Sequence, residues 1–187
     1  ALVGLGLWGR KSPDKFIPTE YLWNDCQGRL RLLQGLMDTD GHAAPEKHAS
    51  YCSTSESLVE GVEFLVRSLG GVTRRRKREF APGEGHLNGN HWVGHRHPLF
   101  SLTIQLPPQV NPFSLRRKAE RLAGRRRRPQ RFIVSVEPAG RGRSVCFKIA
   151  HPSGLFVMND FIVTHNTTLA SFEDVRRFGL EVEFLDQ

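Results

Sequence analysis

One short apolar helix that ends in two carboxylates limits the folds open to this chain of 187 residues. Between positions 29 and 37, leucines and a methionine recur at the three- and four-residue spacing of a single helix face. Asp38-Thr39-Asp40-Gly41 follows at once, with acids and then a glycine of the kind that stops helices. The pattern predicts a helix whose C-terminal end presents both carboxylates.

A second helix and two strands are predicted next. An amphipathic helix is predicted after Ser55, whose hydroxyl can accept hydrogen bonds from the first helix amides. The two glycines at 70–71 are predicted to end this helix. The stretch VTRRRKREF at 72–80 predicts an edge strand with a basic outer face, and residues 99–106 predict another strand. The Gly- and His-rich residues between them, 81–98, are predicted to form a long loop.

Four histidines of this loop have spacings that could hold zinc in principle. Apart from Glu84, no cysteine or acid lies close enough in the sequence to complete a ligand set. A zinc site is therefore not predicted, although the sequence brings together His86, His91, His95 and His97.

The C-terminal third changes to a β-rich pattern. Prolines precede a short basic helix at 114–122, and the arginine run at 125–128 is predicted to be a linker or a DNA-facing arm. Beyond it, short apolar segments separated by Pro-Ala-Gly and Pro-Ser-Gly turns predict strands. These segments are RFIVSVEP (131–138), SVCFKIA (144–150), LFVMND (155–160) and FIVTHN (161–166).

The charge of the chain favours a polyanionic partner. Lysine and arginine number 27 against 19 acidic residues, for a net charge of +8, so double-stranded DNA is the expected partner. No apolar run is long enough to span a bilayer, so no membrane partner is predicted, and the three cysteines without a CxxC pair indicate a reducing, cytoplasmic location. The candidate DNA-binding residues are Arg74, Arg75, Arg76, Lys77 and Arg78, of which strand alternation places about half on one face, and Arg116, Arg117 and Lys118 on the short helix.

The segment LQGLMDTDG at 33–41 resembles the LAGLIDADG motif of homing endonucleases, with Gly, Asp, Asp and Gly in matching places. The resemblance implies that Asp40 is a catalytic carboxylate that binds Mg²⁺, that Gly35 permits close contact with a second helix, and that Asp38 has a structural role at the helix end. The flanking text KFIPTEYL, YCSTSESLVEGVEFLVRSLGG and NPFSLRRKAER is similar to the second repeat of this family as found inside inteins, which extends the resemblance to about 15–131. The alternative interpretation of this segment is an ordinary helix C-terminus whose acids are solvated and have no catalytic role.

This resemblance implies an α+β fold, with an αββαββα-like endonuclease half followed by the C-terminal β-strands of a Hint (intein) fold. Only one copy of the motif is present, whereas a monomeric enzyme of the family needs two to cut both strands. A first copy is therefore expected upstream of Ala1, or the chain must dimerise. The chain also begins directly in an apolar stretch, so its natural N-terminal part is expected to lie outside this sequence.

The segment around His165 carries a second chemical signal. An asparagine amide can attack its own backbone carbonyl, close a succinimide and cut the chain, while a neighbouring histidine protonates the leaving amine and a hydroxyl accepts an acyl group. His165, Asn166 and Thr167 supply these groups in order. The ending FIVTHN resembles the C-terminal block of inteins, which implies that Asn166 cyclises, His165 assists and Thr167 is the downstream nucleophile, without a cofactor.

Two departures from the intein pattern affect this prediction. Leu155 stands where many inteins have a further histidine, and Ala150 stands about where an acid is common. The N-terminal splicing nucleophile and its helpers are not recognisable. The chain alone is therefore expected to cleave after Asn166 at most, and its predicted partners are the missing N-terminal intein half and the host extein.

The predicted domains follow from these signals. Residues 1–14 are a linker or the end of a preceding repeat, 15–130 a LAGLIDADG repeat, 131–166 the C-terminal splicing segment and 167–187 host protein. The host remainder fits a P-loop ATPase or a serine recombinase equally well. Intein splicing combined with DNA cleavage is the leading function, and the alternatives are a non-catalytic basic DNA-binding remnant or a fragment of such a host with an insertion.

Overall fold

The computed structural model describes residues 2–44, 48–88, 91–122, 128–138, 140 and 149–165. The chain divides into two compact units, Ala1–Val136 and Glu137–Gln187, which are treated separately below. Within the described ranges, no helix has both the length and the apolar character needed to cross a bilayer. The domain boundaries expected from the sequence stay predictions.

The first unit is an α+β domain, as predicted. With the small hairpin β4–β5 set aside, its elements from α2 to α4 follow the predicted order α-β-β-α-β-β-α. The elements are η1 (Ser12–Asp14), α1 (Thr19–Leu22), α2 (Cys26–Asp40), β1 (Gly41–Ala43), β2 (Ala49–Ser53), α3 (Glu56–Ser68), β3 (Val72–Arg78), β4 (Gly85–Asn88), β5 (His91–Gly94), β6 (Leu99–Gln105), α4 (Arg116–Ala119) and η2 (Glu120–Leu122).

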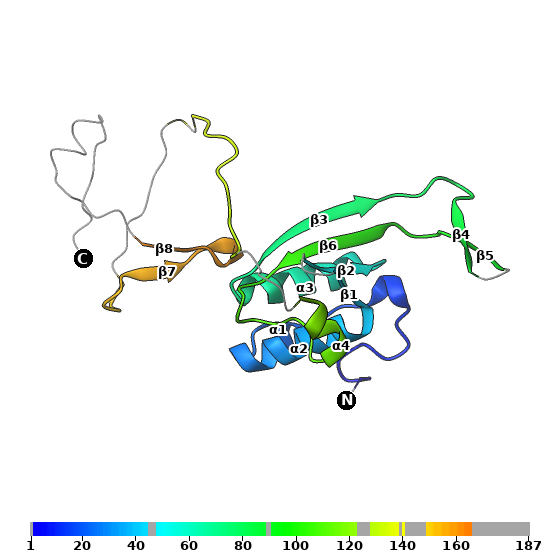
Figure 1. Cartoon of the computed structure of the whole chain (residues 1–187), viewed down its shortest axis with the longest axis horizontal. Coiled ribbons are helices and arrows are strands. Elements are labelled where there is room, and N and C mark those ends of the chain that lie inside the picture. The colour runs from blue at the N-terminus through cyan, green and yellow to red at the C-terminus, as the bar shows by residue number, and fades with distance from the viewer. Residues whose placement is uncertain are drawn as a thin grey trace. The chain divides into compact units, whose positions relative to one another are not determined.

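A four-stranded antiparallel sheet forms the centre of this unit, in the order β1-β2-β6-β3. Figure 1 shows the helices on one side of the sheet. The core lies between them, because alternate side chains of β6, such as Leu102 and Ile104, pack with apolar residues of α3, such as Val62 and Leu65, and all four are at most 1% exposed. Within the described part of the first unit, no helix covers the other side of the sheet (Figure 1).

The two predicted helices begin where their capping residues place them. The Asp25 carboxylate accepts a hydrogen bond from the Gly28 amide at 2.6 Å, and the Ser55 hydroxyl accepts one from the Leu58 amide at 3.1 Å. Gly70 follows α3 with φ +79°, the left-handed conformation that ends a helix. The sequence predictions for α2 and α3 are confirmed.

Gly41 ends α2, but not through a left-handed turn. Its φ is −79° and β1 starts at this residue, so the chain passes from helix to strand without a loop. A Cβ atom on Gly41 would lie 2.6 Å from the Met37 carbonyl oxygen and 2.7 Å from the Met37 Cε. The glycine is therefore required for space at a tight junction.

The prediction of a long loop at 81–98 is wrong, because β4 and β5 form an antiparallel hairpin there. Asn88 pairs with His91, so the two residues between the strands are the Gly-Asn at 89–90, a dipeptide typical of two-residue hairpin connections that could have indicated the hairpin. The strand prediction at 72–80 and that at 99–106 are confirmed by β3 and β6, and β3 lies at an edge of the sheet.

The predicted β-rich tail is confirmed only in part. In the second unit, β7 (Leu155–Val157) and β8 (Val163–His165) pair antiparallel, with η3 (Asn159–Phe161) between them. Residues 131–138 form no strand, and no strand of the described chain pairs with them. Their large apolar side chains are 80 to 96% exposed. Most of 144–150 lies outside the described residues, and the Hint fold stays a prediction.

Gly41→Ala is expected to lower the free energy of unfolding by about 1 to 3 kcal/mol, because the new methyl group must displace Met37. Gly35→Ala is the matched control. A methyl group there meets no atom within 4 Å, so helix propensity alone should raise stability by about 0.5 to 1 kcal/mol. Urea unfolding measures both changes, and equal losses in the two variants would contradict the steric explanation at Gly41.

Candidate active site and nucleic-acid interface

Asp40, the predicted catalytic acid, is the last residue of α2 and is exposed. Its side chain makes no ion pair or hydrogen bond with any residue that the structure describes. A carboxylate that is free of protein partners can bind a divalent cation, and Mg²⁺ prefers such oxygen ligands. Among the described residues no three His, Cys, Asp or Glu side chains gather into a ligand group around it or elsewhere.

Asp38 has a structural role, as the resemblance implied, but its partners lie about 76 residues further along the chain. Its carboxylate accepts hydrogen bonds from the Ser114 amide at 3.1 Å and the Leu115 amide at 3.2 Å. The Ser114 hydroxyl donates a further hydrogen bond to it. Asp38 therefore holds the two residues that lead directly into α4.

Lys118 of α4 makes a second set of contacts with the end of α2. Its ammonium group donates to the carbonyl oxygens of Met37 at 3.0 Å, Asp38 at 2.8 Å and Gly41 at 2.6 Å. A lysine has three N–H donors, so all of them are used, at the negative end of the α2 dipole. Asp38 thus binds the segment that enters α4, and Lys118 of α4 binds the end of α2; this pair of contacts is called here the reciprocal cap.

The other two basic residues of α4 remain at the surface. Arg116 pairs with Glu120 at 2.6 Å on an exposed face. Arg117 is exposed and has no ion pair among the described residues. Of the three residues predicted to bind DNA on this helix, Lys118 is the one whose donors are already occupied, which the sequence did not show.

The basic run of β3 divides between the two faces of the sheet. Arg75 lies opposite Leu102, a residue with no exposure, so it faces the helices. Arg74 lies opposite Thr103 and Arg76 opposite Ser101, which places them on the uncovered side. The strand alternation expected from the sequence is therefore present, with Thr73, Arg75 and Lys77 on one side and Arg74, Arg76 and Arg78 on the other.

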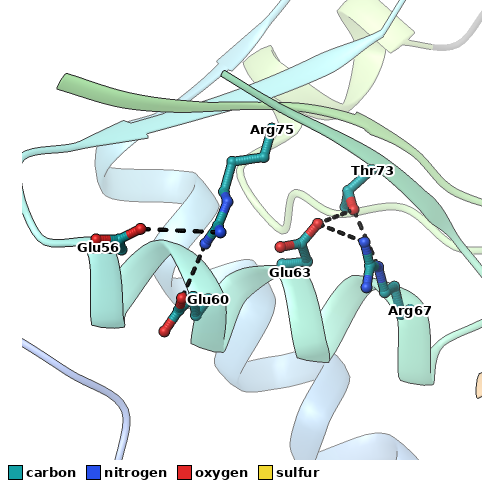
Figure 2. A network of polar contacts seen from close by, with 6 residues as sticks. All are labelled: Glu56, Glu60, Glu63, Arg67, Thr73 and Arg75. Atoms are coloured by element: carbon teal, nitrogen blue, oxygen red, sulfur yellow. Dashed lines mark hydrogen bonds and ion pairs between the residues drawn. The ribbon is translucent and has the colours of Figure 1, made fainter. Parts of the chain in front are cut away.

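On the helix side, acids of α3 contact Arg75 and Thr73 of β3 (Figure 2), whereas Lys77 pairs with Glu79. Arg75 forms ion pairs with Glu60 at 3.0 Å and Glu56 at 3.9 Å. The hydrogen bond to Glu60 raises the pKa of Arg75 above its ordinary value. These contacts hold Arg75 against α3 and away from the uncovered face.

Glu63 forms the second half of the same network. It accepts a hydrogen bond from the Thr73 hydroxyl at 2.6 Å and forms an ion pair with Arg67 at 2.8 Å (Figure 2). Arg67 also donates to the Thr73 hydroxyl oxygen at 3.3 Å. The edge strand is thereby fixed to α3 by polar contacts where an inner strand would use apolar ones.

The uncovered face of the sheet, called here the open face, is basic and polar. None of the four strands contains an acidic residue. Arg74 and Arg76 are exposed and have no ion pair among the described residues, whereas Arg78 pairs with Glu84. Strand register adds further residues to this face that the sequence analysis missed: His42, Ser50, Cys52, Ser101 and Thr103.

Tyr51 is a buried polar residue beside the acidic helix end that the sequence analysis did not single out. It is 1% exposed, pairs with Gly41 in the sheet, and its hydroxyl has no hydrogen-bond partner among the residues that the structure describes. Burial, followed by the charge of Asp40, raises the pKa of Tyr51 to about 12. The phenol therefore stays protonated near Asp40 at neutral pH.

The predicted splice junction is described only at its first residue. His165 is exposed and ends β8, directly opposite Leu155 of β7. The turn that joins the strands has positive φ at Asp160 (61°) and Phe161 (56°), which is the conformation of a tight hairpin turn. Asn166 and Thr167 lie outside the described residues.

Comparison with known proteins bears on the first unit. Residues 28–92 match the model of the LAGLIDADG-like domain family. This stretch is therefore similar to LAGLIDADG-like domains. It begins in α2 and ends in β5, so it contains Asp40 and the basic strand β3. The match supports a relation of this stretch to the homing endonuclease family.

The chain is also similar to the replicative DNA helicase DnaB of Mycobacterium intracellulare. The two are 31% identical over 162 residues, which is 83% of this chain and 26% of that protein. The chain therefore spans about a quarter of the length of this relative. The similar region extends well beyond the LAGLIDADG-like domain.

Lys118→Met, which keeps the length of the side chain but removes its charge, is expected to lower the free energy of unfolding by about 1 to 2 kcal/mol. The carbonyl groups at the end of α2 lose their cationic donor. Arg117→Met removes the same charge from an exposed position and should change stability by about 0.5 kcal/mol or less. Chemical denaturation measures both, and similar values for the two variants would contradict the reciprocal cap.

Proposed function

We propose that the first unit is one half of a Mg²⁺-dependent homing endonuclease that binds duplex DNA on the open face and cuts it with Asp40. The observation that carries this proposal is the free carboxylate of Asp40 at the end of a firmly held helix, in the same unit as a sheet face with unpaired arginines. The LAGLIDADG-like match over 28–92 supports it.

The open face is suited to the phosphate backbone. Arg74 and Arg76 are exposed cations on one strand, with no acid on any strand of the sheet to compete for them. Backbone phosphates attract such side chains and fix the register of a protein on a duplex. Polar neighbours such as Ser101 and Thr103 lie on the same face and are able to donate and accept hydrogen bonds at base edges.

The acidic helix end fits half of a metal site. When bound, Mg²⁺ supplies a Lewis acid that polarises a phosphate and lowers the pKa of a bound water. Asp40 holds one position of its shell, the reciprocal cap fixes the helix end that carries it, and DNA phosphates and a second motif copy would supply the remaining ligands. Gly35 supports the need for a second copy, because the space beside it is open to a close helix.

Removal of open-face arginines should weaken DNA binding in a charge-dependent way. Arg74→Gln and Arg76→Gln are each expected to reduce the slope of log affinity against log salt by about 1, as one phosphate contact is lost. Arg75→Gln is the matched control, since it removes the same charge from the face that α3 covers. Fluorescence anisotropy at several salt concentrations measures the slopes, and equal changes in all three variants would contradict the assignment of faces.

Asp40→Asn should abolish Mg²⁺-dependent nicking or cutting while DNA binding persists, because the change removes a metal ligand and leaves the open face intact. The assay uses the whole chain and a duplex that spans an uninterrupted insertion site. Asp14→Asn, a neutralisation at an exposed position in η1, is the control and should leave cutting unchanged. Wild-type protein that binds DNA but never cuts it would favour the alternative of a non-catalytic DNA-binding remnant.

We further propose that residues 131–166 are the C-terminal splicing segment of an intein and that 167–187 belong to the host. The observation that favours this second function is the β7–β8 hairpin, which ends at His165 directly before Asn166. Similarity to a replicative DNA helicase over 83% of the chain fits an insertion inside an enzyme that acts on DNA. Of the two predicted hosts, a helicase relative favours the nucleotide-hydrolysing P-loop enzyme.

Cleavage after Asn166 has a clear chemical balance. The side-chain amide nitrogen of Asn166 attacks its own carbonyl carbon, the bond to Thr167 breaks, and the released amine takes a proton with assistance from His165. Mass spectrometry of incubated protein should detect a peptide that begins at Thr167 and a partner that ends in succinimide. Asn166→Ala should abolish both products and His165→Ala should slow their appearance, whereas an intact wild-type chain would contradict the splicing proposal.

A further inference from the structure

The β4–β5 hairpin lies beyond the ends of β3 and β6 (Figure 1). It is held at its base by Glu84. This carboxylate pairs with Arg78 of the open face and accepts a hydrogen bond from the Ala81 amide at 3.0 Å. The backbone carbonyl of Glu84 accepts another from the His95 amide at 2.8 Å. The hairpin is therefore fixed to the end of the basic strand.

A stack of rings reinforces this base. The Arg78 guanidinium lies 4.9 Å from the centre of the Phe80 ring, Phe80 stacks on His95 at 4.0 Å, and His95 stacks on His86 at 5.1 Å. The first member belongs to β3 and the last to β4. Side-chain stacking thus continues from the open face into the hairpin.

Trp92 lies on β5 and is 60% exposed. It sits diagonally across the strand pair from Gly85, and a Cβ on Gly85 would come within 2.8 Å of two atoms of its indole ring. The ring therefore occupies the space that a side chain at position 85 would need. A large aromatic ring that rests on a glycine backbone with most of its surface in solvent is a preformed platform for a flat ligand.

The charge around this platform selects the ligand. Residues 81–98 contain Arg96 and several histidines, and their one acid, Glu84, is already paired with Arg78. An aromatic side chain in a cationic, acid-poor surface suits a nucleic acid, because bases stack on aromatic rings while phosphates meet the cations.

We propose that the β4–β5 hairpin is a DNA-contacting arm in which Trp92 packs against a base or deoxyribose next to the segment bound by the open face. This inference rests on the proposed DNA binding and extends its footprint. The arm adds an apolar contact to a surface that otherwise holds DNA by charge. The arm also extends the open face beyond Arg78, the last residue of β3.

Fluorescence gives the most direct test. Trp8→Phe and Trp23→Phe in the whole chain leave Trp92 as the single tryptophan. Addition of the target duplex, without divalent metal, should quench or shift its emission. Trp92→Ala in the wild-type background should weaken binding about tenfold and leave the salt slope unchanged, because stacking is lost and no charge is removed. Trp8→Ala, at a position that is 73% exposed, is the control and should bind as wild type does.

The outcomes separate this inference from the proposed function. If Arg74→Gln weakens binding while Trp92→Ala does not, and emission is unchanged by DNA, the arm is wrong and the open face stands. If the wild-type chain does not bind duplex DNA, the proposed function itself fails. If Trp92→Ala instead reduces self-association in sedimentation, the platform is a protein contact and the DNA arm is overturned.

Discussion

The reciprocal cap between α2 and α4 is the contact on which the candidate site depends. Asp38 satisfies the amides of Ser114 and Leu115 directly before α4, and Lys118 of α4 satisfies carbonyls at the end of α2, so the two helix ends are joined in both directions. Asp40 lies between the capped carbonyls of Asp38 and Gly41. A short helix of four residues thereby fixes the position of an acid that has no side-chain partner of its own.

The edge strand β3 also depends on polar contacts with a helix, on one of its two faces. Its inward residues are polar, and the acids of α3 compensate them, as Glu60 does for Arg75. Inward-facing charge on an edge strand also discourages pairing with other chains. Those acids form their ion pairs on the covered side. Arg74 and Arg76 on the open face therefore have no acidic partner among the described residues. The fold thus separates a run of basic residues into a paired set that faces α3 and an unpaired set on the open face, as far as the described residues show.

Local sequence signals were sufficient for much of this fold, and long-range contacts were not accessible to them. The helices α2 and α3 follow from apolar spacing and from caps next to them in the sequence, as with Ser55 and Leu58. The role of Lys118 depends on carbonyls 77 to 81 residues away, which no spacing rule can reveal. Residues 131–138 carry a strand-like composition, but a strand also needs a partner, and the described chain provides none.

The two faces of α2 differ in how closely other described residues pack against them. Leu33 and Met37 have no exposure and belong to the core, whereas Gly35 is exposed and has no atom within 4 Å of where a Cβ would lie. A glycine inside a helix costs about 1 kcal/mol relative to alanine. Nothing within the described chain offsets that cost, in contrast to Gly41, where a side chain would clash with Met37. A second helix packed closely against Gly35 would account for it, and would also bring a second acid to the end of α2 beside Asp40.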